Sequence, residues 1–252
     1  MLKITNTEVY GWKAAIRGMR NPMNSWDKSD SYICDNYDWC DECEAGRNDD
    51  DELCNKYRDI GDNDLSLMKK LANAGPDHGK VLRYLTVQLD ISAPLYWWKE
   101  FKTYRKDRRF MDDGDDFLDP EELEMFIETN SCSTMHKIHT KEFELDDFSH
   151  EHLTYDKMIC KNVYSPLVIL EETIHTLNDC RTLYLETKNK KYWYSMIQLL
   201  PSSYNQLRTV QLNYQVLRRM YHARKNHKLD EWRDFCAWIK TLPYSELITG
   251  ED

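Results

Sequence analysis

The clearest pattern of hydrophobic and polar residues lies in Leu199–His227, where a stop, a strand and a helix follow one another. Pro201 ends the helix suggested by Tyr192–Leu199, because proline lacks the backbone donor that a helix needs. Leu207–Leu212 alternates in character and predicts a short, half-buried strand. Asn213 stands where its side chain can cap the helix that follows. That helix has a buried stripe at three-to-four spacing, formed by Val216, Leu217, Met220 and Tyr221.

Asn213 and Arg224 are eleven residues apart on this helix, which is about three turns. They therefore share one edge of it. An amide and a guanidinium on one edge can hold an anionic, planar ligand, because arginine offers a fixed fork of donors. A solvated face with an ordinary cap is the alternative.

The same two patterns, alternation for strands and three-to-four spacing for helices, predict the other elements. Strands are expected over Leu2–Val9 and Leu85–Ile91. Helices are expected over Gly11–Met19, Asp64–Ala74, Ser165–Glu186 and Leu229–Leu242, with another that Ala93-Pro94 opens and that carries Trp97, Phe101 and Arg105 on one face. The buried stripe of Ser165–Glu186 is expected to include Leu183, and the tail from Gly250 is expected to be loose.

Length and charge limit the function. A chain of 252 residues suits a single domain, and its net charge of −10 argues against binding a nucleic-acid polymer through a basic surface. No apolar run approaches the ~20 residues that span a bilayer, and Met1–Tyr10 has no signal-peptide core. We therefore expect a soluble, cytoplasmic protein that has no contact with a membrane.

Two acidic insertions interrupt the domain, at about 30–60 and about 106–129. The first holds four cysteines that could form a structural zinc site or remain unpaired thiols, whereas disulfides fit the expected compartment poorly. These are Cys34, Cys40, Cys43 and Cys54. We expect no bound metal, and a zinc site formed by these four cysteines is the alternative. In the second insertion Asp119-Pro120-Glu121 predicts a capped helix start, and Gly114 is misplaced for a calcium loop.

The segment Asn130–Ile138 combines hydroxyl, thiol and imidazole groups. Ser133 or Cys132 beside His136 would suit a nucleophile if a base and an orienting group were adjacent. The alternative is a serine cap on an exposed turn of helix.

Several separated segments together resemble the flavin-dependent thymidylate synthase family, in the order that this family has. The matching positions are His78, Ala93-Pro94, Arg105, Leu200-Pro201, Asn213, Arg224 and His227. The resemblance covers most of the chain outside the two insertions.

The chain also departs from the family pattern. Thr103-Tyr104-Arg105 stands where the family has Arg-His-Arg, and Glu100 replaces a common glutamine. Twenty-seven residues (Lys106–Cys132) separate Arg105 from Ser133, which best matches the family serine. Met135 occupies the place of a family arginine. The usual set of phosphate-binding arginines is thus reduced.

The resemblance implies an α+β fold with a mixed sheet and long helices, assembled as a homotetramer with flavin sites between subunits. It implies FAD as cofactor, NADPH and methylenetetrahydrofolate as co-substrates, and the methylation of dUMP to dTMP. Ser133 and Arg224 would be catalytic, and His78, Asn213 and His227 would bind the cofactor. Arg105, Glu100, Ser133 and Arg224 would bind the nucleotide.

Two alternatives stay open because of Thr103-Tyr104. One is a different modification of uridylate on the same scaffold. The other is a non-catalytic nucleotide-binding or regulatory protein that kept the fold.

Overall fold

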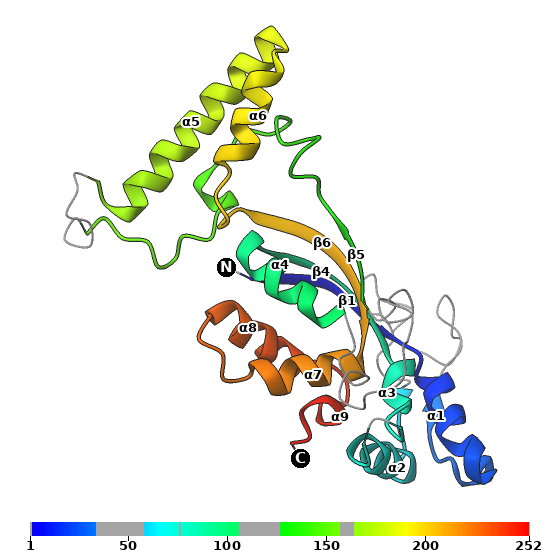
Figure 1. Ribbon diagram of the computed structural model, residues 1–252. Coiled ribbons are helices and arrows are strands. Elements are labelled where there is room, and N and C mark those ends of the chain that lie inside the picture. The colour runs from blue at the N-terminus through cyan, green and yellow to red at the C-terminus, as the bar shows by residue number, and fades with distance from the viewer. Residues whose placement is uncertain (1, 34–57, 76, 106–126, 157–163, 252) are drawn as a thin grey trace, which may run out of the picture. The chain divides into compact units, whose positions relative to one another are not determined.

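The computed structural model describes residues 2–33, 58–75, 77–105, 127–156 and 164–251 (Figure 1). Its strands are β1 (Lys3–Tyr10), β2 (Tyr32–Ile33), β3 (Arg58–Asp59), β4 (Thr86–Pro94), β5 (Glu128–Ser131) and β6 (Asn205–Asn213). Its α-helices are α1 (Trp12–Arg20), α2 (Asp62–Asn73), α3 (Val81–Tyr84), α4 (Leu95–Phe101), α5 (Pro166–Thr187), α6 (Lys190–Leu199), α7 (Tyr214–Arg224), α8 (Asp230–Ile239) and α9 (Glu246–Thr249).

The described residues form two compact units, each made of separate stretches of chain. Unit 1 comprises Met1–Thr7, Gln88–Gln211 and Asn226–Phe235. Unit 2 comprises Glu8–Val87, Leu212–Lys225 and Cys236–Asp252.

The main sheet has the strand order β1-β4-β6-β5. Strands β5 and β6 pair antiparallel, with Ser131 opposite Arg208. Val87, Leu89 and Ile91 of β4 are buried and alternate with half-buried neighbours, which confirms the strand predicted over Leu85–Ile91.

Aromatic side chains of α4 and α8 form the core of unit 1. Trp97 packs against Trp98 and Trp232, with ring centroids 4.9 and 4.8 Å apart. Phe101 and Phe235 complete this cluster, and all five rings are buried. Large buried rings give α4 and α8 most of their stabilisation, since each removes a wide apolar area from water.

A second hydrophobic cluster in unit 1 joins α5 and α6, which lie side by side in Figure 1. Leu170, Ile174 and Leu177 of α5 pack with Met196 of α6. The long helix was predicted to within one residue at each end. Leu183 was wrongly assigned to its buried stripe: the residue is 38% exposed.

In unit 2 the ring of Trp12 packs edge-on against Tyr214 and Tyr244, with centroids 5.8 and 5.2 Å away. Gly11, which precedes α1, has a φ of 97°. A Cβ there would lie 1.9 Å from the carbonyl oxygen of Tyr84. Only glycine therefore fits this close approach of two backbones.

Two predicted helix ends need correction. Helix α4 stops at Phe101, and Lys102–Arg105 continues as a 3₁₀ helix, so Arg105 does not extend the α-helical face of Trp97. The tail is not loose up to Glu251. Gly250 closes α9 in the left-handed conformation, and the Glu251 carboxylate accepts a hydrogen bond from the Tyr221 hydroxyl at 2.9 Å.

The predictions for the four insertion cysteines and for the helix start in the second insertion concern residues outside the described ranges, namely Cys34, Cys40, Cys43, Cys54 and Asp119-Pro120-Glu121. Within the described ranges no group of three or more potential ligands could hold a metal ion. None of the helices in those same ranges has the length and apolarity to cross a bilayer.

Candidate functional site

Asn213 joins β6 to α7 and caps that helix, as predicted. Its Oδ1 accepts a hydrogen bond from the backbone N–H of Val216 at 3.0 Å. The residue is buried, with 7% exposure. The carboxamide oxygen is engaged in the cap, and the NH₂ group of Asn213 is the part of the side chain that can donate hydrogen bonds to a ligand.

Replacing Asn213 with alanine is expected to lower the free energy of unfolding by about 1 kcal/mol through loss of the cap. Asn213→Asp keeps an acceptor and should cost less. Chemical denaturation of both variants measures this, and an alanine variant as stable as the wild type would contradict the role of the cap.

Two further predicted residues belong to unit 2 together with Asn213. Arg224 lies in the last turn of α7 and is half-buried. His78 lies in a turn before α3 and is exposed. All three present donors of hydrogen bonds, an amide, a guanidinium and an imidazole, which suit acceptor-rich phosphate or heterocyclic ligands.

In unit 1 the structure brings Glu100 and His227 together. Oε2 of Glu100 accepts a 2.9 Å hydrogen bond from the indole N–H of Trp232 and lies 3.8 Å from Nε2 of His227. Their side chains are 39% and 23% exposed, so a ligand can reach both. Trp232 is fully buried and packs against Trp97 of α4, so it supports the Glu100 carboxylate from the core side.

The backbone fixes the tautomer of His227. Nδ1 accepts the N–H of Leu229 at 3.2 Å, so in the neutral ring the proton is on Nε2. That proton faces the carboxylate of Glu100. Glu100 and His227 thus place a carboxylate, which accepts hydrogen bonds, beside a ring N–H, which donates them.

The hydroxyl of Tyr96, near the start of α4, donates a hydrogen bond to the carboxylate of Glu231 at the start of α8. Burial raises the pKa of Tyr96, and the hydrogen bond and charge of Glu231 raise it further. The phenol therefore stays protonated and acts as a structural link.

Ser133 lies in an exposed turn rather than on a helix. Its hydroxyl accepts the backbone N–H groups of Met135 and His136 at 3.3 and 2.9 Å. The Nδ1 of His136 is 3.4 Å away, and no carboxylate among the described residues orients that imidazole. The arrangement is a serine turn, and among the described residues it lacks the third group that would orient the imidazole of an activated nucleophile.

Arg208 is a buried cation that the sequence interpretation did not single out. It is 8% exposed and its guanidinium stacks 4.2 Å from the ring of Trp98. Two of its nitrogens donate to Oε1 of Gln206, whose Nε2 donates to the carbonyl of Cys132. This network ties the backbone before Ser133 to β6. The alternation on β6 was the available signal, because Gln206 and Arg208 share the buried face of Val210.

The seven predicted site residues are thus divided between the units. Glu100, His227, Ser133 and Arg105 belong to unit 1, and His78, Asn213 and Arg224 belong to unit 2. Within unit 1, the side chains of Glu100 and His227 lie 3.8 Å apart. Arg105 lies in the 3₁₀ helix after α4.

The fold was compared with solved structures. Two structures of the flavin-dependent thymidylate synthase of Helicobacter pylori, each complexed with FAD and dUMP, match with a TM-score of 0.60 and 16% sequence identity. The matches cover 98% and 99% of this chain and 98% of each of the other chains. No protein-family model and no curated protein matches the chain. The part of the chain that the structure describes therefore has a fold similar to that of flavin-dependent thymidylate synthases.

Proposed function

We propose that this protein is a flavin-dependent enzyme that methylates dUMP to dTMP, with FAD as cofactor and NADPH and methylenetetrahydrofolate as co-substrates. The observation that carries the proposal is the fold similarity, over 98% of both chains, to an enzyme whose structure holds FAD and dUMP. The residues that match the family by spacing, from His78 to His227, support it independently.

The donor set fits both ligands. FAD and dUMP present phosphate oxygens and ring carbonyls, which accept hydrogen bonds. Arg105 and Arg224 would bind phosphate through charge-assisted hydrogen bonds, while His78 and the NH₂ group of Asn213 would donate to FAD. The buried position of Asn213 and its fixed oxygen orient that amide before a ligand arrives.

Glu100 and His227 would hold the ring systems. Glu100 would accept a hydrogen bond from the ring N–H of uracil. Its carboxylate is held for this role by the hydrogen bond from Trp232. His227, with its proton on Nε2, would donate to a flavin acceptor. FAD supplies hydride transfer when bound. Ser133 would position the base, and its occupied hydroxyl argues against attack on the ring.

Formation of dTMP tests the proposal. Purified protein supplied with FAD, NADPH, methylenetetrahydrofolate and dUMP should form dTMP, and the gene should restore growth of a thymidine-requiring strain. Arg224→Ala should abolish growth rescue at comparable protein levels. If the wild-type protein forms no dTMP and its gene does not restore growth, the proposed catalytic function is wrong.

One observation favours a second candidate, a nucleotide-binding protein without catalysis. Thr103-Tyr104 replaces two family side chains that would contact flavin or substrate, and the Tyr104 ring lies 5.9 Å from that of Trp232 in the aromatic cluster. Binding of dUMP that depends on Arg224, without dTMP formation, would support this candidate.

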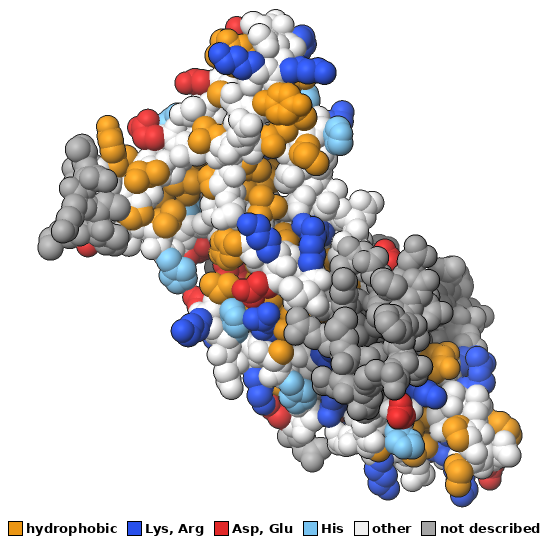
Figure 2. All heavy atoms as spheres, in the orientation of Figure 1, with side chains coloured by type: hydrophobic (Ala, Val, Ile, Leu, Met, Phe, Trp, Pro, Cys, Tyr) orange, Lys and Arg blue, Asp and Glu red, His pale blue; other side chains and the backbone are white. Residues whose placement is uncertain are grey.

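We also propose a homotetramer, as the resemblance implies. Hydrophobic side chains are exposed along the α5–α6 hairpin (Figure 2). Ile169 and Tyr194 are 50% and 54% exposed, and Leu183, Leu185 and Leu199 are also exposed. Apolar surface gathered on one hairpin is typical of a subunit interface.

Light scattering at micromolar concentration should therefore give four times the 30.3 kDa mass of one chain. Ile169→Glu should lower the mass by introducing a charge into the interface, while Asp179→Ala at an exposed polar position of the same helix should not. A monomeric wild type would contradict the assembly.

A further inference from the structure

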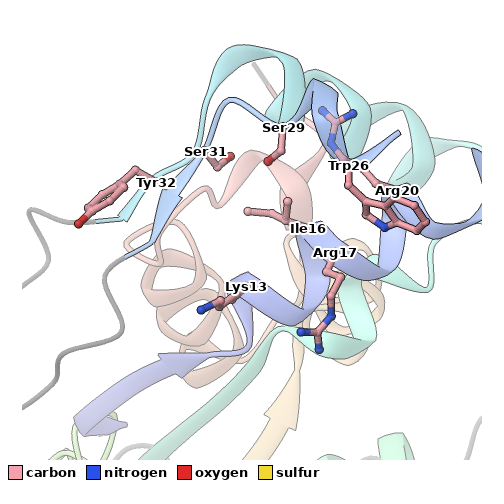
Figure 3. A pocket seen from close by; sticks show the side chains of 8 residues that line it. All are labelled: Lys13, Ile16, Arg17, Arg20, Trp26, Ser29, Ser31 and Tyr32. Atoms are coloured by element: carbon pink, nitrogen blue, oxygen red, sulfur yellow. The ribbon is translucent and has the colours of Figure 1, made fainter. Parts of the chain in front are cut away.

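Unit 2 contains a pocket that none of the predicted site residues lines. Its volume is about 480 Å³, within the range of small-molecule sites, about 300–1,000 Å³. It lies between α1 and the segment that leads from Trp26 to Tyr32 (Figure 3). The side chains that give it chemical character are Lys13, Ile16, Arg17, Arg20, Trp26 and Tyr32.

Helix α1 places cations along this pocket. Lys13, Arg17 and Arg20 are four and three residues apart and so share one face of the helix with Ile16. Figure 3 shows Lys13, Ile16 and Arg17 projecting from α1. Arg17 is exposed, and no ion pair or hydrogen bond engages it in the described part of the chain. No carboxylate is among the described residues that line the pocket.

Aromatic rings supply the second feature. Trp26 and Tyr32 are 51% and 57% exposed, although both are large and partly apolar. The indole N–H of Trp26 donates to Oδ1 of Asn21 at 2.8 Å, which fixes the orientation of the ring. A fixed, exposed indole is a platform on which a flat ring can stack.

A hydrogen-bond network centred on Asp64 holds three of the residues that line the pocket. Asp64 is fully buried and accepts hydrogen bonds from Arg20, Ser29 and Ser31, each at 2.6 Å. The two serine hydroxyls and one guanidinium are therefore held in place. The charge of Arg20 is balanced by Asp64, so Arg17 is the exposed cation of α1 that a ligand would meet first.

We propose that this pocket binds a nucleoside monophosphate, separately from the site that contains Arg224. The base would stack on Trp26, and the phosphate would bind Arg17 and Lys13 through charge-assisted hydrogen bonds. A ligand with both a flat ring and an anionic group uses the apolar and the cationic sides of the pocket together. In a chain of net charge −10, local cations give such a site its selectivity for anions.

Calorimetric titration with AMP tests the proposal, because AMP has a broad ring and is not the proposed substrate. The wild type should bind AMP, and adenosine, which lacks the phosphate, should bind about tenfold more weakly. Arg17→Ala and Trp26→Ala should each weaken AMP binding about tenfold. Trp26→Phe should retain most of the affinity. Lys190→Ala, which removes one exposed charge at the start of α6, should leave it unchanged.

Arg17 and Trp26 are exposed, so both variants should melt at the wild-type temperature, which separates lost binding from lost folding. Titration of FAD and dUMP into the same variants should leave their affinity for the site that contains Arg224 unchanged. Parallel loss of AMP and FAD binding would make the pocket part of the flavin site and overturn the proposal. So would AMP affinities unchanged by both substitutions, or no AMP binding at millimolar concentration. Failure of the wild type to bind FAD or dUMP would affect only the proposed function.

Discussion

Arg20→Ala is expected to lower the free energy of unfolding by about 3–5 kcal/mol, because it leaves a buried carboxylate without its cation. Nε of Arg20 lies 2.6 Å from Oδ1 of Asp64, and the two side chains are 5% and 0% exposed. Ser29 and Ser31 would still donate to Asp64, but neutral hydroxyls do not compensate its charge.

Lys141→Ala is the matched control. Lys141 pairs with Asp147 at 2.9 Å, but its side chain is 64% exposed. An exposed pair contributes about 0–1 kcal/mol, so this variant should unfold near the wild-type denaturant concentration. A loss below about 1 kcal/mol in Arg20→Ala would show that the buried pair is not a principal support of unit 2.

The same pair sets an acid limit. Burial raises the pKa of Asp64, but hydrogen bonds from Ser29, Ser31 and Arg20, together with the charge of Arg20, outweigh it and lower the pKa below 3.8. A lowered folded-state pKa contributes stability that is complete above the unfolded pKa and is lost as the pH falls through the folded pKa. The free energy of unfolding of the wild type should therefore exceed that of Asp64→Asn by less and less as the pH falls below about 3.8.

Arg224→Ala is expected to weaken binding of dUMP or FAD about ten- to a hundredfold. Charge-assisted hydrogen bonds contribute about 1.5–3 kcal/mol, and every 1.4 kcal/mol is a factor of ten. The reduced set of family arginines leaves Arg105 and Arg224 with a larger share of phosphate binding than the full pattern would. Arg105→Ala should therefore show a loss of the same size.

Arg219→Ala is the control for Arg224. It removes the same charge from the same helix, about 140° round the axis. Calorimetric titration of both ligands into the three variants measures the difference. Equal affinities in Arg219→Ala and Arg224→Ala would indicate that α7 acts only through its net charge, and the assignment of Arg224 would be wrong.

Elements whose causes are local in the chain could be predicted from the sequence. Helix α7 was predicted with its cap at Asn213 and with Val216, Leu217, Met220 and Tyr221 buried, and the structure confirms each. Cap and stripe lie within a dozen residues, so spacing alone reveals them. The strand before it was predicted too short, because Asn205 and Gln206 are polar at positions where pairing extends the ladder.

Elements that depend on distant partners could not be predicted. Strand β5 has the sequence Glu-Thr-Asn-Ser, which has no apolar alternation, and it becomes a strand by pairing with β6. The order of the tail depends on Tyr221, thirty residues from Glu251. The proximity of Glu100 and His227 arises from the packing of Trp232 on α4, which no local pattern encodes.

The visible absorption spectrum tests the central claim most directly. Protein incubated with FAD and then freed of unbound ligand should keep the bands of an oxidised flavin at about one FAD per chain, and NADPH with dUMP should bleach them. Protein that keeps no flavin absorbance after the same treatment would contradict the assignment of this fold to flavin-dependent chemistry.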